Sequence, residues 1–261
     1  WNELTEEERR VEAREMELYA AMVENLDHQI GRLLAYLEEL GELDNTLVVF
    51  MSDNGAAGAD FYYDSTRPFR EFLQARYDNA YENMGRPGSW ISYGVPWAEA
   101  GTAPFRLYKT HATQCGVLAP LIATGPGVAG GGTINRAFAT AMDIAPTFLE
   151  IAGAEYPSDG SVRPMLGESM VDVLTGEANA VHADDYAVLI NHRRASYLRR
   201  GDWKLISLTD PTDPASFGLF NVAEDPGETT DLRTSRPDMY EELIALWQAE
   251  TERLGIVLIG R

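Results

Sequence analysis

An acidic side chain and an amide side chain stand next to each other just after an apolar run in this sequence. The run extends from Leu47 to Met51, and Asp53 and Asn54 follow it in the motif LVVFMSDNG. The run predicts a buried strand, and open α/β sheets bind their ligands at the carboxyl ends of strands. Carboxylate and amide oxygens are ligands that Ca²⁺ prefers, and Gly55 allows a sharp backbone turn beside them. The pattern predicts a divalent-cation site, while an ordinary turn is the alternative explanation of the same three residues.

The charge balance limits the partners that this protein can bind. The 261 residues carry a formal net charge of -20, which opposes binding to nucleic acid and to anionic membranes. A small anionic substrate would need a local cation or a few well-placed basic side chains. No apolar stretch approaches the roughly 20 residues of a membrane-spanning helix. The single cysteine, Cys115, excludes an intrachain disulfide and a thiolate metal cluster.

Helix and strand patterns surround the Asp-Asn-Gly motif. A capping box, Thr5 to Glu8, begins a long helix whose apolar residues recur at three- and four-residue spacing, and Gly41 is its expected end. The helix-to-strand order favours one repeat of an α/β layer structure. The run Pro120 to Thr124 (PLIAT) predicts a second buried strand, and a helix is expected from Met142 to Ile151.

Residues 56 to 105 show no sustained periodicity and are expected to form a long functional loop or irregular structure over a cleft. Aromatic residues in this stretch would either line a cleft for an aryl substrate or pack the loop onto the core. They are Tyr62, Tyr63, Trp90, Tyr93 and Trp97.

The first 150 residues predict too few strands for a complete sheet. Only two buried strands are expected there, whereas a parallel sheet needs several. The strands therefore pair with another chain, or the sequence is the later part of a longer protein. The start at Trp1 shows no signal-peptide pattern, which indicates an internal or processed beginning.

Short alternating strands follow from about Tyr186, with Gly201 and Asp202 at a hairpin turn. A helix is expected from Pro237 to Leu254, and the terminal IVLI run is expected to form an edge strand or a docking tail. We therefore expect two parts, residues 1–178 and a small antiparallel-sheet plus helix subdomain at residues 179–261.

Six segments of the sequence form an ordered set. They are GRLLAYLEELG, VVFMSDNG, PWAEAGTAPFRLYKTHATQCG, APLIATGPG, ATAMDIAPTFLEIAG and LFNVAEDPGETTDL. In this order they resemble the C-terminal half of type I sulfatases, in particular bacterial arylsulfatases of the alkaline-phosphatase-like superfamily, and the resemblance extends from about Leu18 to Trp247. It implies an α/β fold containing the later part of a large mixed sheet with flanking helices, followed by a small α+β subdomain with an antiparallel sheet.

This resemblance implies roles for three side chains. Asp53 and Asn54 correspond to two oxygen ligands of the divalent cation, usually Ca²⁺, and Lys109 corresponds to the sulfate-binding lysine. A cation and an ammonium group would stabilise the charge that develops on a sulfate ester as its S–O bond breaks.

The histidines are further candidates. His111 lies two residues after Lys109, and imidazole donates protons near neutral pH, so His111 is a second candidate substrate-binding residue. The catalytic histidines of the family lie in its earlier half, which argues against a catalytic role for His111. Solvated or structural roles are expected for His182 and His192, and a local hydrogen bond for His28.

Departures from the family pattern shape the expected function. The family's nucleophile is a formylglycine made from the cysteine or serine of a C/S-x-P-x-R motif, which this sequence lacks. Cys115 is followed by Gly-Val-Leu-Ala and cannot be that residue; it replaces a common glycine, and Leu118 replaces a common arginine.

We therefore expect the C-terminal portion of an arylsulfatase, inactive alone, whose formylglycine and remaining Ca²⁺ ligands come from the N-terminal half of the same protein or a second chain. Its substrate would be a small sulfate ester. The alternatives are a phosphonate monoester hydrolase or phosphodiesterase of the same superfamily, or a non-catalytic protein that binds a partner.

Overall fold

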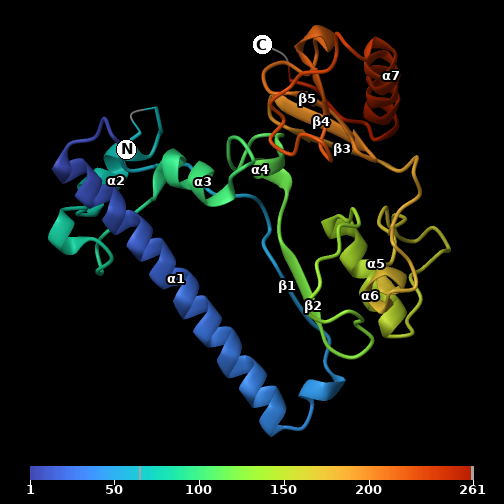
Figure 1. The fold of residues 1–261 in the computed structure, drawn as a ribbon, viewed down its shortest axis with the longest axis horizontal. Coiled ribbons are helices and arrows are strands. Elements are labelled where there is room, and N and C mark those ends of the chain that lie inside the picture. Colours follow the sequence, from blue (N-terminus) through green and yellow to red (C-terminus); the bar gives the residue numbers. More distant parts are fainter. Residues whose placement is uncertain (65, 260–261) are drawn as a thin grey trace.

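The computed structural model describes residues 1–64 and 66–259 (Figure 1). A long helix, a two-stranded sheet and a four-stranded sheet are joined by short helices and irregular chain in the described part. None of the helices in these ranges has the length and apolarity needed to cross a membrane. The elements up to the second strand are α1 (Glu6–Glu39), η1 (Leu43–Asn45), β1 (Val48–Met51), α2 (Arg70–Arg76), η2 (Tyr81–Asn83), α3 (Gly94–Thr102), α4 (Gln114–Val117) and β2 (Leu121–Thr124). The remainder are η3 (Ala141–Asp143), α5 (Ile144–Ile151), α6 (Val171–Thr175), β3 (Ala187–His192), β4 (Ala195–Arg200), β5 (Trp203–Ser207), η4 (Pro214–Ser216), β6 (Gly218–Asn221) and α7 (Pro237–Arg253).

Helix α1 begins with the capping box that the sequence predicts. The Glu8 amide donates to Thr5 Oγ1 at 3.2 Å, and the Thr5 amide donates to Glu8 Oε2 at 2.8 Å. These bonds satisfy two amides that the first helical turn leaves unpaired. The helix ends at Glu39, and Gly41 takes a left-handed conformation with φ 70°, as is common after helices. The predicted start and stop are confirmed.

Most of the apolar stripe of α1 lies in solvent. Met22 is 72% exposed and Leu33 is 58% exposed. Only the first turns are packed, where Tyr19 stacks on Tyr93 with ring centroids 4.8 Å apart. Figure 1 shows α1 running separately from β1 and β2, to which its C-terminal end is joined through η1. Amphipathic helices owe most of their stability to burial of the apolar face. The described residues do not cover this face of α1, so the helix lacks a packing partner there.

Glu15 on the packed end of α1 makes folding depend on pH. Burial, together with the nearby Glu12 and Asp60 carboxylates, raises the pKa of Glu15 from 4.5 to about 8. The folded state therefore favours the protonated form of Glu15. The contribution of this protonation to the free energy of unfolding is fully present below pH 4.5 and is lost as the pH rises through about 8.

We expect Glu15→Gln to raise the melting temperature at pH 8 by about 2–4 °C or more and to have a much smaller effect at pH 5. Glu24→Gln, at an exposed position of the same helix, is the matched control and should change neither value. Thermal unfolding followed by circular dichroism at both pH values measures the difference. An equal shift at both pH values would contradict the expectation.

Strands β1 and β2 form a two-stranded sheet. They run antiparallel, with Val48 opposite Thr124 and Met51 opposite Leu121. An antiparallel pair is compatible with the mixed sheet that the resemblance implies. Burial falls short of the expectation, because Leu121 and Ile122 are exposed and the residues of β1 are at most half-buried. No further described strand joins this sheet. Apolar strands of this kind are normally buried within a larger sheet that is covered on both faces.

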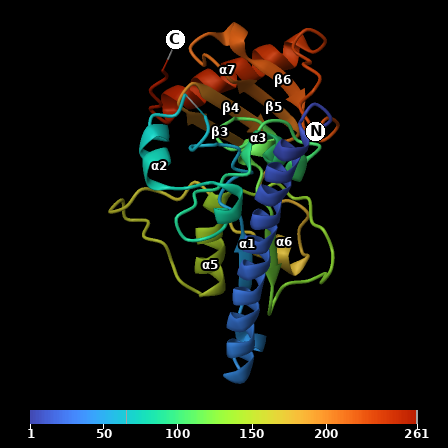
Figure 2. The ribbon, with the colours of Figure 1, turned by 90° about the vertical axis from the view of Figure 1, so that its left-hand side faces the viewer.

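The C-terminal sheet has the order β3-β4-β5-β6 with every neighbouring pair antiparallel. Gly201 and Asp202 connect β4 to β5, which confirms the predicted hairpin. Helix α7 lies across one face of the sheet (Figure 2), and the shared core is fully or almost fully buried. The alternating strands therefore form a core of their own, while the division at residue 178 stays a prediction. The core residues are Leu198, Leu205, Phe217, Leu219, Leu243 and Trp247.

Residues 256–259 continue after α7 as irregular chain. Leu258 packs against the core of the C-terminal sheet. Of the two expectations for the terminal apolar run, this contact agrees with the docking tail and not with the edge strand.

Candidate functional site

Asp53 and Asn54 lie in a bend immediately beyond β1, where the sequence places them. The Ser52 amide donates to the Pro120 carbonyl at 3.2 Å, and Ser52 Oγ donates to the Asn54 carbonyl at 2.8 Å, which fixes the bend beside β2. Asp53 is exposed and Asn54 is half-buried. Within the described residues, the Asp53 carboxylate and the Asn54 side-chain amide take part in no hydrogen bond, so both keep their oxygens for an external ligand.

The donor set fits a calcium ion in chemistry and falls short in number. One carboxylate and one amide are hard oxygen donors, as Ca²⁺ requires, but the ion takes about six to eight oxygens. No group of three or more His, Cys, Asp or Glu residues in the described ranges is arranged to hold a metal. The Asp53 carboxylate and the Asn54 amide by themselves supply fewer oxygens than a complete Ca²⁺ site.

Lys109 lies on a loop that contacts the one carrying Asp53 and Asn54. The Lys109 amide donates to the Ala56 carbonyl at 2.8 Å, two residues beyond Asn54. The Lys109 side chain is exposed, and the ion pairs formed among the described residues do not include its ammonium group. The structure thus brings the main chains of the two predicted site segments together and leaves the cationic side chain available to an anion.

Gly55 allows the loop of Asp53 and Asn54 to lie directly against the backbone of α4. The Gly55 amide donates to the Gly116 carbonyl at 3.4 Å, and a Cβ at position 55 would lie 1.5 Å from the Cys115 carbonyl oxygen. The φ of Gly55 lies outside the left-handed region, so the sharp turn expected from the sequence is not the reason for glycine. Glycine is required here because the backbone of α4 occupies the space of any side chain.

Cys115 itself is buried at 2% exposure, and its Sγ lies 2.8 Å from Thr102 Oγ1. A buried thiol of this kind behaves as a small packing residue. The structure therefore agrees with the sequence argument against Cys115 as a nucleophile.

A buried polar network lies behind α4, and the sequence analysis did not find it. Lys204 in β5 and Glu228 in the loop after β6 are both fully buried, with Lys204 Nζ 2.9 Å from Glu228 Oε1. Lys204 Nζ also donates to the side-chain Oε1 of Gln114 at 3.0 Å, and the main-chain amide of Gln114 donates to Glu228 Oε2 at 2.8 Å. Burial lowers the pKa of Lys204 to about 8 even though Glu228 favours its charged form. The available signal was a lysine inside the otherwise mainly apolar strand WKLIS.

Comparison with known proteins decides the family. The family model described as Sulfatase matches residues 2–154. The model described as N-sulphoglucosamine sulphohydrolase, C-terminal, matches residues 109–254. The chain belongs to the sulfatase family.

Sulfatase relatives extend well beyond the length of this chain. An uncharacterized sulfatase of Schizosaccharomyces pombe is 38% identical over 267 residues, which cover 98% of this chain and 47% of that protein. The arylsulfatase of Klebsiella aerogenes is 41% identical over 168 residues, which cover 64% of this chain and 35% of that protein. The chain thus spans about half the length, or less, of these curated relatives.

Solved sulfatase structures confirm the expected fold class. An enzyme solved in complex with its substrate D-glucosamine-2-N,6-O-disulfate has a TM-score of 0.60 at 26% identity, over 90% of this chain and 40% of that chain. The antiparallel sheets and flanking helices described above are consistent with a partial alkaline-phosphatase-like fold.

The His111 side chain of this sulfatase chain contacts the neighbouring residue Tyr108. Its Nδ1 lies 3.1 Å from the Tyr108 carbonyl oxygen, and its ring stands edge-on to the Tyr108 ring at 4.6 Å. The ring is half-buried beside the Lys109 loop. These contacts orient the imidazole, and a role of His111 in substrate binding stays a prediction.

The aromatic residues of the 56–105 stretch mainly pack this segment. Trp97 Nε1 donates to the Glu12 carbonyl of α1 at 3.0 Å, and Tyr93 stacks on Tyr19. Trp90 lies 5.3 Å from Tyr77 between ring centroids. Of the two expectations for these rings, the contacts favour packing onto α1 and the neighbouring loop.

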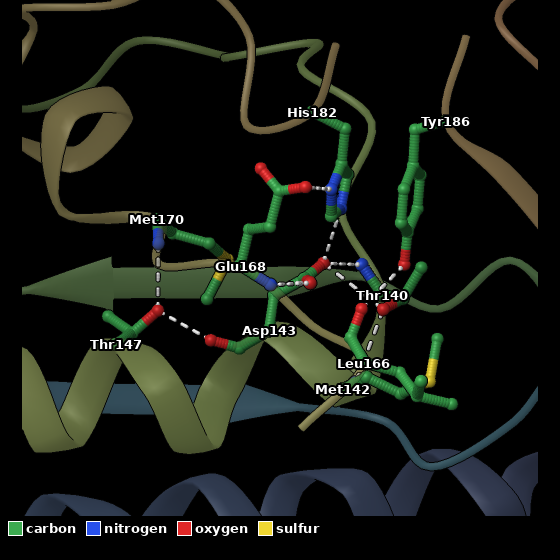
Figure 3. A network of polar contacts seen from close by, with 9 residues as sticks. All are labelled: Thr140, Met142, Asp143, Thr147, Leu166, Glu168, Met170, His182 and Tyr186. Atoms are coloured by element: carbon green, nitrogen blue, oxygen red, sulfur yellow. Dashed lines mark hydrogen bonds and ion pairs between the residues drawn. The ribbon is translucent and has the colours of Figure 1, made fainter. Parts of the chain in front are cut away.

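His182 has a structural position, as one of the two expected roles implies (Figure 3). Its side chain is 4% exposed, its Nε2 lies 2.9 Å from Asp143 Oδ2, and its ring stacks on Tyr186 at 3.7 Å. Asp143 Oδ1 also accepts from the Glu168 amide at 2.9 Å. The histidine thereby fastens the connector before β3 to the start of α5.

Proposed function

We propose that this chain is the C-terminal portion of an arylsulfatase, a sulfuric ester hydrolase, and that Asp53, Asn54 and Lys109 contribute to its active site. The observation that carries the proposal is the 2.8 Å hydrogen bond from the Lys109 amide to the Ala56 carbonyl. This bond joins the Lys109 loop to the loop of Asp53 and Asn54. Among the described residues, the Lys109 ammonium group forms no ion pair and the side-chain oxygens of Asp53 and Asn54 accept no hydrogen bond, which supports a shared role of these side chains. The membership in the sulfatase family supports assigning a sulfate ester to this pair of loops.

Each of these residues would act through charge. The oxygens of Asp53 and Asn54 would hold Ca²⁺ with ligands from outside this chain, and the ion would supply positive charge to the sulfate oxygens. The Lys109 ammonium group would donate to a sulfate oxygen and stabilise the negative charge that grows there as the ester S–O bond breaks. The nucleophile, a formylglycine, would come from the N-terminal half of the same protein or from a second chain.

The partner in this proposal is the N-terminal half of the same protein or a second chain. The exposed stripe of α1 and the exposed apolar residues of β2 support it, because large uncovered apolar surfaces mark contact sites. The relatives named above, which are about twice as long or longer, offer a segment of suitable size.

Calorimetric titration with Ca²⁺ tests the metal assignment. We expect the chain alone to show no tight binding, and the parent protein, which includes the preceding segment, to bind Ca²⁺ with a clear stoichiometry. Asp53→Ala in the parent protein should weaken binding by about tenfold or more, since a charged ligand is lost. Asp44→Ala, at an exposed position before β1, is the control. Undiminished Ca²⁺ binding by Asp53→Ala would refute the role of Asp53.

A further inference from the structure

The buried pair of Lys204 and Glu228 closes a ring with Gln114. Three hydrogen bonds of 2.8–3.0 Å connect the Lys204 ammonium, the Glu228 carboxylate, and both the side chain and the main chain of Gln114. The side chains of Lys204 and Glu228 are fully buried, and Gln114 is 6% exposed. Removing two charges from water costs several kcal/mol per ion by general estimate, so this arrangement is a poor way to gain stability alone. It does fix the position of Gln114, the first residue of α4.

Helix α4 is the element that contacts both predicted site loops. Its residues Cys115 and Gly116 lie against Gly55, as described above. A Cβ at Gly116 would also lie 2.1 Å from the His111 carbonyl oxygen, so the backbone of α4 packs closely against the end of the Lys109 loop. A shift of Gln114 would therefore be passed directly to both loops.

The Lys109 loop has a conformation that must be held from outside. Leu107 and Thr110, on either side of Lys109, have φ values of 62° and 81°. Such left-handed backbone is strained for a non-glycine residue and persists only where the surroundings enforce it. Thr113 Oγ1 donates to the Arg106 carbonyl at 3.0 Å and closes the base of the loop immediately before Gln114.

We propose that Lys204 and Glu228 are positioning residues of the sulfatase site, which hold α4 and, through it, the Lys109 loop against the loop of Asp53 and Asn54. The C-terminal sheet is then a part of the framework of the site, since β5 and the loop after β6 supply the two charges. The inference rests on the proposed function for the role of Lys109, whereas the coupling between the buried pair and the loop is independent of it.

The test uses the parent protein with Lys204→Met, with Lys204→Met/Glu228→Met, and with a control, Arg253→Met, which removes an exposed ion pair on α7. Hydrogen exchange of residues 106–117 and of β3–β6, and kcat and KM for an aryl sulfate, are measured for each. In Lys204→Met we expect faster exchange of residues 106–117, and a fall in kcat of about tenfold or more with a smaller change in KM. Arg253→Met should match the wild type in both.

The double variant separates positioning from stability. Replacing a buried ion pair by apolar residues of similar volume is often neutral for stability. In the double variant, the hydrogen-exchange rate of β3–β6 should therefore equal that of the wild type. Because Gln114 has lost both of its hydrogen bonds to the buried pair, residues 106–117 should still exchange fast and kcat should stay low. A double variant with wild-type exchange in residues 106–117 would overturn the inference.

Two further outcomes are distinguishable. Equal acceleration of exchange across residues 106–117 and β3–β6 in both variants would show a merely structural pair and overturn the inference. If the wild-type parent protein has no sulfatase activity, the proposed function fails, while selective acceleration in residues 106–117 still supports the coupling.

Discussion

Replacing Lys109 by alanine in the complete parent protein should lower kcat/KM for an aryl sulfate by about 100- to 1000-fold. The expected size follows from removing one preorganised donor to an oxygen that gains charge in the transition state. Lys109 is exposed and forms no ion pair within the described ranges, so its loss should cost little stability. Steady-state kinetics with a chromogenic aryl sulfate, together with a thermal unfolding curve, measure both effects.

His111→Ala is the matched control, because His111 lies on the same loop and is held by the Tyr108 carbonyl. We expect a loss of less than about tenfold for this variant, as for a residue that does not transfer the proton. A loss for His111→Ala as large as that for Lys109→Ala would contradict this expectation and place His111 in the site beside Lys109. A Lys109→Ala variant with wild-type kinetics would remove Lys109 from the site.

Gly55→Ala is expected to damage the site through the backbone. The new Cβ would lie 1.5 Å from the Cys115 carbonyl oxygen, a distance that forces the loop of Asp53 and Asn54 away from α4. A displacement of about 1 Å can reduce turnover about 100-fold, and overpacking of this kind costs roughly 1–3 kcal/mol of stability. The measurements are kcat/KM and the denaturant midpoint of the parent protein.

Gly101→Ala provides the comparison, since no atom lies within 4 Å of a Cβ at that position of α3. Helix propensity predicts that this second variant is neutral or slightly stabilising. Equal behaviour of the two alanine variants would show that the contact between Gly55 and Cys115 does not hold the site.

Local patterns account for the parts of the fold that the sequence predicted well. The capping box of Thr5 and Glu8 depends on residues three apart, and the hairpin at Gly201 depends on alternation in two adjacent strands. Both elements bury or pair their groups within their own neighbourhood. The bend at Asp53 was also predicted, because an apolar run followed by Ser-Asp-Asn-Gly marks the end of a strand.

Long-range contacts account for what the sequence left out. The ring of Lys204, Glu228 and Gln114 joins residues up to 114 positions apart, and no local pattern encodes that meeting. The antiparallel pairing of β1 with β2 was left open for a related reason: an apolar run predicts a buried strand without giving the direction of its neighbour. The reason for Gly55 likewise became visible only from the position of Cys115.

Turnover of an aryl sulfate in the presence of Ca²⁺, by this chain alone and by the parent protein, tests the central claim most directly. The claim is that Asp53, Asn54 and Lys109 are one part of a sulfate-ester site whose nucleophile lies outside this chain. We expect turnover by the parent protein that depends on Lys109, and none by the chain alone above its own Lys109→Ala variant. Turnover by the isolated chain well above that variant would contradict the claim.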